Sequence, residues 1–308
     1  MSNSLNFKAH PRSWRDFKLV YPVIARRSKG LSIGVNLNPD RVCNFDCIYC
    51  EVNRTDFHPS KGLIPLPPKN LPRPKVELAT ISRELLALLT MVKDGTLWNE
   101  SDFATTPENL KRLNDIAFSG DGEPTACPQF SGAVQAVIEA RTLAGFTSQT
   151  VKLVLITNAT RFHRPNVREG LRAIVGAQGE IWAKLDAGTP EYFRKIDKTN
   201  IDYGRVLENI LSLSGELPLN IQTCMMRVNG ESPSLTEIEA YIQRLAYFLE
   251  NGAKLNTVQL YTVARPPAQA YVSSLNEAEL AEIAGLIRQR TGLSVEFFGG
   301  SVGLTQKG

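Results

Sequence analysis

From residue 115 onward, short runs of consecutive apolar residues alternate with longer segments in which apolar residues recur at helical spacing. Short aliphatic runs such as residues 151–158 (VKLVLITN) predict buried strands. Longer segments with apolar residues at helical spacing follow them, and residues 234–252 open on Ser234 with Glu237 at capping-box spacing. The expected strands cover residues 30–37, 115–120, 151–158, 180–188, 217–228 and 257–265. A helical segment follows each one, including a helical region within 192–215, and residues 293–300 predict a last short strand.

This alternation predicts an α/β fold built from parallel βαβ units. Polar or glycine-bearing residues come at the carboxyl ends of the expected strands, as in SGDGEPT, TNAT and KLDAG. In a β/α barrel that rim is where chemistry is assembled, so the pattern favours a barrel-type arrangement. A doubly wound open sheet is the alternative architecture.

The chain is expected to divide into three parts. Residues 1–29 form a basic N-terminal arm, residues 30–267 the α/β core, and residues 268–308 a C-terminal helix and short strand packed on that core. Within the core, residues 54–75 contain six prolines and predict a surface loop, and residues 96–114 predict a polar insertion.

Composition is that of an ordinary globular protein. The 308 residues are 43% hydrophobic and 21% charged, which excludes a disordered chain. We expect no membrane association, because no apolar run of about 18 residues occurs. The N-terminus lacks the apolar stretch of a secretory signal, so we expect a cytoplasmic protein with reduced thiols and no disulfide scaffold.

The net charge of +4 is mild but uneven. Seven Lys or Arg residues lie between Lys8 and Lys29 against the single acid Asp16. A second cluster comprises Arg161, Arg164, Arg168 and Arg172. A solvated basic face is the commoner explanation and the one we favour; the alternative is that the arm holds tRNA or another polyanion.

Three of the five cysteines lie in one short stretch, NLNPDRVCNFDCIYCEV, as Cys43, Cys47 and Cys50. A redox pair would use CIYC alone and leave Cys43 unexplained. Structural zinc takes four ligands, usually in two pairs, whereas Cys127 and Cys224 are single and distant. Three thiolates on one loop can hold a four-iron, four-sulfur (4Fe-4S) cluster and leave the fourth iron open. We therefore favour a cluster over zinc.

The C-x3-C-x2-C spacing, with the aromatic Tyr49 before the last cysteine, resembles the signature of the radical S-adenosylmethionine (radical SAM) superfamily. SGDGEPT, WAKLDAG and VQLYTVARPP resemble later landmarks of that superfamily, in the same order, over residues 30–267. The resemblance implies a partial (β/α)6 TIM-like barrel. It also implies S-adenosyl-L-methionine (SAM) on the fourth iron, a 5′-deoxyadenosyl radical that abstracts hydrogen from a substrate, and an external electron donor such as a flavodoxin or ferredoxin.

The same resemblance implies a set of SAM contacts: Tyr49, Gly120, Gly122, Glu123, Asn158, Lys184, Asp186, Thr262, Val263 and Arg265. The glycine segment would contact the methionine amino group, Asp186 the ribose hydroxyls, and residues 262–263 the adenine. Asp121 replaces a glycine of the usual pattern. Structural alternatives stay open: a tight turn at 120–123, a turn role for Asn158, an internal Lys184–Asp186 ion pair, and an Arg265 that only anchors the Pro-Pro turn. Beyond the cluster ligands no catalytic residue is assigned.

Within the superfamily, YPVIARRSKGLSIGVNLNPDRVCNFDCIYCEVNR and the later RPP resemble the wyosine-base-forming tRNA enzymes. Those enzymes are associated with a second cluster on further N-terminal cysteines, and no cysteine precedes Cys43 in this sequence. Their substrate therefore does not carry over. The rival from another class is a non-enzymatic metal-binding protein, with zinc or a cluster serving structure or electron transfer, docked to RNA through the basic arm.

Overall fold

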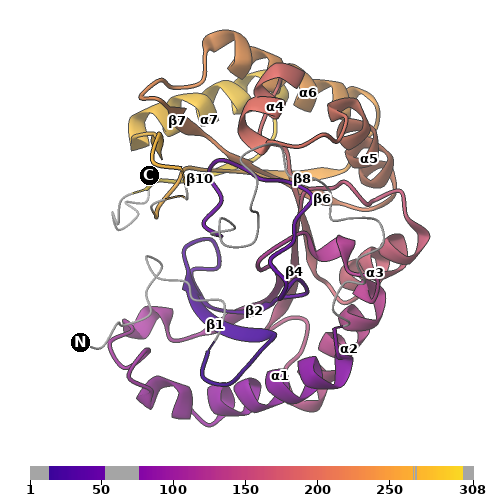
Figure 1. Cartoon of the computed structure of the whole chain (residues 1–308), viewed down its shortest axis with the longest axis vertical. Helices are drawn as coiled ribbons and strands as arrows, with labels where there is room; N and C mark the ends of the chain where they lie inside the picture. The colour runs from indigo at the N-terminus through magenta and orange to yellow at the C-terminus, as the bar shows by residue number, and fades with distance from the viewer. Residues whose placement is uncertain (1–13, 53–75, 266, 268, 301–308) are drawn as a thin grey trace. The chain divides into compact units, whose positions relative to one another are not determined.

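The computed structural model describes residues 14–52, 76–265, 267 and 269–300 (Figure 1). The proline-rich loop expected over residues 54–75 lies outside them. The strands are β1 (Val20–Ala25), β2 (Gly30–Val35), β3 (Leu113–Phe118), β4 (Lys152–Thr157), β5 (Glu180–Lys184), β6 (Leu219–Cys224), β7 (Met226–Val228), β8 (Leu255–Tyr261), β9 (Val272–Ser274) and β10 (Val295–Phe298). The helices are α1 (Leu78–Lys93), α2 (Phe130–Leu143), α3 (Pro165–Gly176), α4 (Pro190–Asp197), α5 (Tyr203–Glu216), α6 (Leu235–Glu250) and α7 (Glu277–Thr291), with 3-10 turns η2 (Thr96–Asn99), η3 (Glu108–Leu110) and η4 (Pro124–Ala126).

The described residues divide into two compact units. The first takes residues 14–43, 76–157 and 161–182; the second takes residues 44–52, 158–160 and 183–300. The boundary falls within β5, whose last two residues, Ala183 and Lys184, belong to the second unit.

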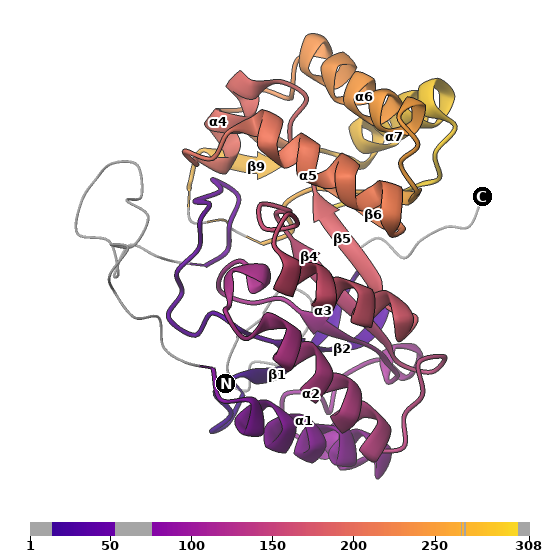
Figure 2. The ribbon, with the colours of Figure 1, turned by 90° about the vertical axis from the view of Figure 1, so that its right-hand side faces the viewer.

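In the first unit the strand order is β1-β2-β3-β4-β5. The β2–β3 and β3–β4 pairs are parallel, as the alternation of strands and helices predicts. Helices α1, α2 and α3 lie side by side (Figure 2). Their buried side chains include Leu85, Leu88 and Val137. These apolar stripes are the reason the segments fold as helices against a sheet rather than alone in water.

Strand β1 lies where the sequence predicts part of a basic arm. It pairs antiparallel with β2, with Pro22 opposite Ile33. Proline has no N–H to donate to a neighbouring strand. Because β1 is an edge strand, its outer side has no neighbouring strand that would need this hydrogen bond. The pattern of apolar residues misses this strand, because a proline interrupts it and basic residues flank it, and it also misses the short β9.

The second unit continues with the order β5-β6-β8-β10. The β6–β8 and β8–β10 pairs are parallel, and β7 with β9 forms a separate antiparallel pair. The single strand expected over 217–228 is thus two, β6 and β7, which separate at Met225. The helical region expected within 192–215 is α4 and α5, and α4 ends at Lys198 with a left-handed φ of 41°.

Helix α6 begins as expected, because the Ser234 hydroxyl accepts a hydrogen bond from the Glu237 N–H. The Glu237 carboxylate does not complete the capping box; it accepts from the N–H of Gly188 and the hydroxyl of Thr189. The complete box is instead at the start of α7. No helix in the described parts of the chain combines the length and apolar character needed to cross a membrane.

Candidate cysteine-loop site

The three clustered cysteines lie on a loop, residues 43–50, that follows β2. All five cysteines are in the described residues, and none is in a disulfide. Cys43, Cys47 and Cys50 are half-buried, whereas the remaining two are buried. The Cys50 N–H donates to the Cys47 carbonyl at 2.9 Å, which closes a turn between these two cysteines.

The backbone of this loop is bound to the end of α4. The Asp46 N–H donates to the Asp197 carbonyl at 3.1 Å, and the Ile48 N–H donates to the Ile196 carbonyl at 2.8 Å. The last carbonyls of a helix have no partner within it. The loop therefore takes up two acceptors that α4 would otherwise leave unsatisfied.

Asn44 fixes the first part of the loop through its side chain and its carbonyl. Its carbonyl accepts from the Thr199 hydroxyl at 2.9 Å. Its amide nitrogen donates to the Thr160 hydroxyl at 2.7 Å, and its amide oxygen accepts from Asn158 at 2.8 Å. The next residue, Phe45, packs edge-on against an α4 ring with centroids 5.6 Å apart. In this chain Asn158 thus supports the loop, as well as the turn that was its structural alternative.

Asp197 also contacts a cysteine directly. The Cys47 thiol donates to Asp197 Oδ1 at 3.2 Å. Asp197 is 1% exposed. Burial, followed by the nearby Asp186 carboxylate, raises the pKa of Asp197 to about 8.

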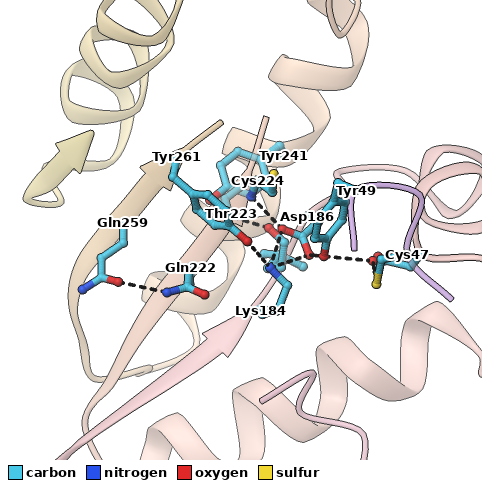
Figure 3. A network of polar contacts seen from close by, with 12 residues as sticks. Cys47, Tyr49, Lys184, Asp186, Gln222, Thr223, Cys224, Tyr241, Gln259 and Tyr261 are labelled. Carbon is cyan, nitrogen blue, oxygen red and sulfur yellow. Dashed lines mark hydrogen bonds and ion pairs between the residues drawn. The ribbon is translucent and has the colours of Figure 1, made fainter. Parts of the chain in front are cut away.

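Tyr49 connects the loop to a buried polar network on β5, β6 and β8 (Figure 3). Its hydroxyl donates to Asp186 Oδ2 at 2.6 Å. Lys184 Nζ lies 3.1 Å from the same oxygen and donates to the Tyr261 hydroxyl at 2.8 Å. The Cys224 N–H donates to Asp186 Oδ1 at 2.7 Å. Of the alternatives for Lys184 and Asp186, the structure shows the internal ion pair.

The protonation states suit this arrangement. Burial lowers the pKa of Lys184, but Asp186 and Tyr261 outweigh it and hold that pKa well above its usual value. Burial, then Asp186, raises the pKa of Tyr49 well above that of a free phenol. Lys184 Nζ also lies 5.0 Å from the centre of the Tyr49 ring and 5.1 Å from that of Tyr261. The lysine therefore stays charged and the Tyr49 phenol keeps the proton that it donates.

Two side-chain amides, one from β6 and one from β8, lie on the same face of the sheet as the Lys184 side chain. The Gln222 amide nitrogen donates to the Gln259 amide oxygen at 3.2 Å, as Figure 3 shows. Thr223, one residue on, faces the other way and shares a 2.6 Å hydrogen bond with Tyr241 of α6.

In the first unit the predicted glycine segment packs against the residues that follow β2. A Cβ at Gly120 would overlap the Asn36 side chain, and a Cβ at Gly122 would overlap the Val42 carbonyl. Asp121 is held by Asn36, whose amide nitrogen donates to Asp121 Oδ2 at 2.7 Å. The glycines are therefore required for close backbone packing, whatever else they contact.

Glu123 is a buried acceptor in the same unit. Its Oε1 accepts from the Thr125 N–H at 3.0 Å, the Thr125 hydroxyl at 2.5 Å and the Thr157 hydroxyl at 2.6 Å. It thereby caps η4 and ties it to the end of β4.

The candidates after β8 also have structural partners. The buried Thr262 hydroxyl accepts from the Leu275 N–H at 2.9 Å, while Val263 is half-buried. Arg265 forms an ion pair with Glu51 at 2.5 Å, so it contacts the residue directly after Cys50. The ion pair with Glu51 gives Arg265 a role besides anchoring the Pro-Pro turn.

The structure thus brings Tyr49, Lys184 and Asp186 together. Three further participants were not assigned from sequence: Asn36, Asp197 and Tyr261. Asn36 and Tyr261 lie inside the quoted motifs at strand ends, which is a usable signal. Asp197 lies in a charged helical stretch, and no feature of the sequence marks it as buried.

The donor set of the loop suits an iron–sulfur cluster. It offers three thiols within eight residues, each partly accessible and outside any disulfide. Among the described residues, no three His, Cys, Asp or Glu side chains are grouped as they would be around a metal ion.

Comparisons with known proteins agree with the fold expected from the sequence. No protein-family model matches the chain. UPF0026 proteins from two Helicobacter pylori strains are 27% and 26% identical over 263 and 265 residues, each match covering 84% of this chain and 70% of the relative. A radical SAM methyltransferase from Sphaerobacter thermophilus matches with a TM-score of 0.58 and 13% identity, over 91% of this chain and 68% of that one. The structure of TYW1 with a lysine-pyruvate adduct bound matches with a TM-score of 0.50 and 16% identity, over 85% of this chain and 74% of that one.

These findings define the class of fold. The chain has the α/β fold of the radical SAM type, a partial TIM-like barrel, and the resemblance expected from the cysteine motif is confirmed at that level. At these identities the likeness to solved structures concerns the fold, so activity is argued from the site.

Proposed function

We propose that the chain is a radical SAM enzyme in which Cys43, Cys47 and Cys50 hold a 4Fe-4S cluster. When bound, the cluster and SAM supply one-electron cleavage of SAM to methionine and a 5′-deoxyadenosyl radical, for hydrogen abstraction from a substrate. The observation that carries this proposal is the C-x3-C-x2-C loop itself, which directly follows the first parallel strand of a radical SAM-type fold. Three thiols on one loop, which holds no fourth cysteine, would leave one metal position open for a cofactor.

The chain's own residues would then position the loop and bind the cofactor. Asn36 shapes the segment at 120–122, where backbone groups can approach a ligand closely because side chains are absent. Val263 and Arg265 complete the proposed cofactor contacts after β8. The cysteine loop needs reduced thiols and an external electron donor, which fits a cytoplasmic location.

The decisive experiment is anaerobic reconstitution of the full chain with iron and sulfide, followed by reduction and addition of SAM. We expect about four irons per chain, and formation of 5′-deoxyadenosine. Replacing Cys43, Cys47 or Cys50 by Ala should abolish both. Cys127→Ala is the matched control, since Cys127 is a buried thiol outside the loop.

Zinc bound at one per chain, with no 5′-deoxyadenosine formed, would assign the loop a structural role. The chain would then be a non-enzymatic metal-binding protein. Retention of SAM cleavage in any of the three loop variants would also overturn the ligand assignment.

For the substrate we propose a base in tRNA, which the basic residues between Lys8 and Lys29 support and which the motif resemblance alone does not carry over. Five of these lie in the described part of the chain: Arg26 and Arg27 are half-buried, and Arg15, Lys18 and Lys29 are exposed. The guanidinium carbon of Arg27 lies 5.8 Å from the centre of the Trp182 ring, a cation–π contact that positions this charge.

The tRNA proposal predicts salt-dependent binding. Neutralising two phosphate contacts should lower the slope of log affinity against log salt by roughly 2. The measurement is tRNA affinity between low and moderate salt for the wild-type chain and for Arg26→Gln/Arg27→Gln. Binding that responds neither to salt nor to these substitutions would discard tRNA as the partner.

A further inference from the structure

Within the second unit, residues 44–49 of the cysteine loop are held by hydrogen bonds from groups other than the thiols. Two backbone N–H groups, of Asp46 and Ile48, donate to the last carbonyls of α4. The Thr199 hydroxyl donates to the Asn44 carbonyl, and the Tyr49 hydroxyl donates to Asp186. The Cys47 thiol adds a further hydrogen bond, to Asp197.

Asp186 is itself immobilised, which makes it a rigid acceptor for Tyr49. Lys184 Nζ lies within 3.2 Å of both carboxylate oxygens, and the Cys224 N–H donates to Oδ1. A carboxylate offers about four acceptor positions, and these contacts with Tyr49 occupy them. Asp186 is 3% exposed. The Asp186 carboxylate is therefore occupied by internal hydrogen bonds and is poorly placed to accept one from a ribose hydroxyl.

We propose that Asp186 and the end of α4, residues 196–199, form a loop support that fixes the backbone of residues 44–49 before any metal binds. Asp186 and Thr199 are then positioning residues, and the Tyr49 hydroxyl holds the loop rather than the cofactor. A backbone ordered in advance leaves the metal to gather only the thiols, which lowers the entropy lost on binding. The inference deepens the proposed function, but the support exists in the metal-free chain and is measurable there.

The test is hydrogen–deuterium exchange on the reduced, metal-free, full-length chain. Tyr49→Phe removes one hydroxyl, and Thr199→Val removes another with little change of shape. In each variant we expect exchange at the Asp46 and Ile48 amides to accelerate about tenfold, since each loses a buried hydrogen bond that holds the loop. Exchange in α6 should stay at the wild-type rate.

Asn276→Ala provides the matched control. It removes the capping box of α7, a helix that supplies none of the loop contacts described above, and so lowers stability by a comparable route. Unchanged loop exchange in both Tyr49→Phe and Thr199→Val would overturn the proposal. Equal acceleration in Asn276→Ala would overturn it too, because the effect would then be one of global stability.

A second readout separates holding the loop from holding SAM. After reconstitution, iron loss to a chelator should be about tenfold faster in Tyr49→Phe, while SAM affinity per cluster-loaded chain stays that of the wild type. Weaker SAM binding per loaded chain would make Tyr49 a cofactor contact and overturn its assignment. If the wild-type chain takes up no iron, the proposed function fails, and the exchange experiment still decides the loop support.

Discussion

The buried carboxyl group of Asp115 shows how burial changes the pKa of a single residue. It is 2% exposed on β3, and the Ser32 hydroxyl donates to its Oδ1 at 2.5 Å. Burial raises the pKa of Asp115, and the hydrogen bond from Ser32 lowers it by less. The charged form is therefore disfavoured in the folded state relative to the unfolded state.

A raised folded-state pKa means that the native state binds a proton more tightly than the unfolded state does. The stability due to Asp115 is present below the usual aspartate pKa of about 3.9, and it is lost as pH rises through the folded-state value. Asp115→Asn should remove this loss. The variant should therefore gain stability relative to the wild type as pH rises from about 4 toward neutrality. Urea unfolding across that range measures it, and a constant difference between the two proteins would refute the assignment.

At the residue scale the sequence predicts side-chain direction better than partners. Lys184 and Asp186 are two apart in the strand expected over residues 180–188, so the pleat predicts a common face. The two side chains do form an ion pair, although β5 ends at Lys184. Their other partners do not follow from the pleat, because Tyr49 lies 137 residues from Asp186 and Tyr261 lies 77 residues from Lys184. Such long-range contacts depend on how strands are placed in the sheet, which a local pattern does not contain.

At the element scale, α1 anchors the start of β1 through one buried carboxylate. Glu84 accepts hydrogen bonds from the N–H groups of Lys18, Leu19 and Val20 at 3.0, 2.9 and 3.1 Å. It is 5% exposed, on the buried face of α1, where most of the other side chains are apolar. The Glu84 carboxylate therefore helps to hold the start of β1 against α1.

Glu84→Ala should lower the free energy of unfolding by about 3 kcal/mol, because three buried donors lose their acceptor. Glu84→Gln keeps one acceptor oxygen and should lose roughly half as much. The exposed Glu139 on α2 is the matched control, and its replacement by Ala should change stability by less than about 0.5 kcal/mol. Urea unfolding of the three variants tests this, and a Glu84→Ala loss no larger than that of the control would show that β1 is held by its pairing with β2 alone.

Element types follow from the sequence where burial is one-sided or complete. Strand β4 coincides with an uninterrupted aliphatic run, and α6 begins at its predicted cap. The boundary between α4 and α5 was missed because apolar spacing continues across it while the backbone turns at Lys198. That turn matters for the site, since the carbonyls freed at the end of α4 are the ones that bind the cysteine loop.

At the scale of the whole molecule, the alternation of strands and helices was enough to predict the fold class, and the TM-score of 0.58 with a radical SAM methyltransferase confirms it. The cysteine spacing was enough to nominate the loop. Neither could give the loop's attachment, because Asp197 and Thr199 become neighbours of residues 44–48 only in the folded chain.

The proposed cluster, in which three cysteines would leave one metal position open, makes a prediction for the whole chain. A ligand that binds only the folded, cluster-loaded state stabilises it by about 2.7 kcal/mol at 100 times its dissociation constant. For a chain of this size that corresponds to a rise of roughly 5 °C in the midpoint of thermal unfolding. Anaerobic thermal unfolding with and without SAM measures the shift. The chain in which Cys43, Cys47 and Cys50 are all replaced by Ala should show none, since SAM would lose its metal contact. An equal shift in that chain would mean that the strand-end residues alone bind SAM, and that the cluster contributes electrons without holding the cofactor.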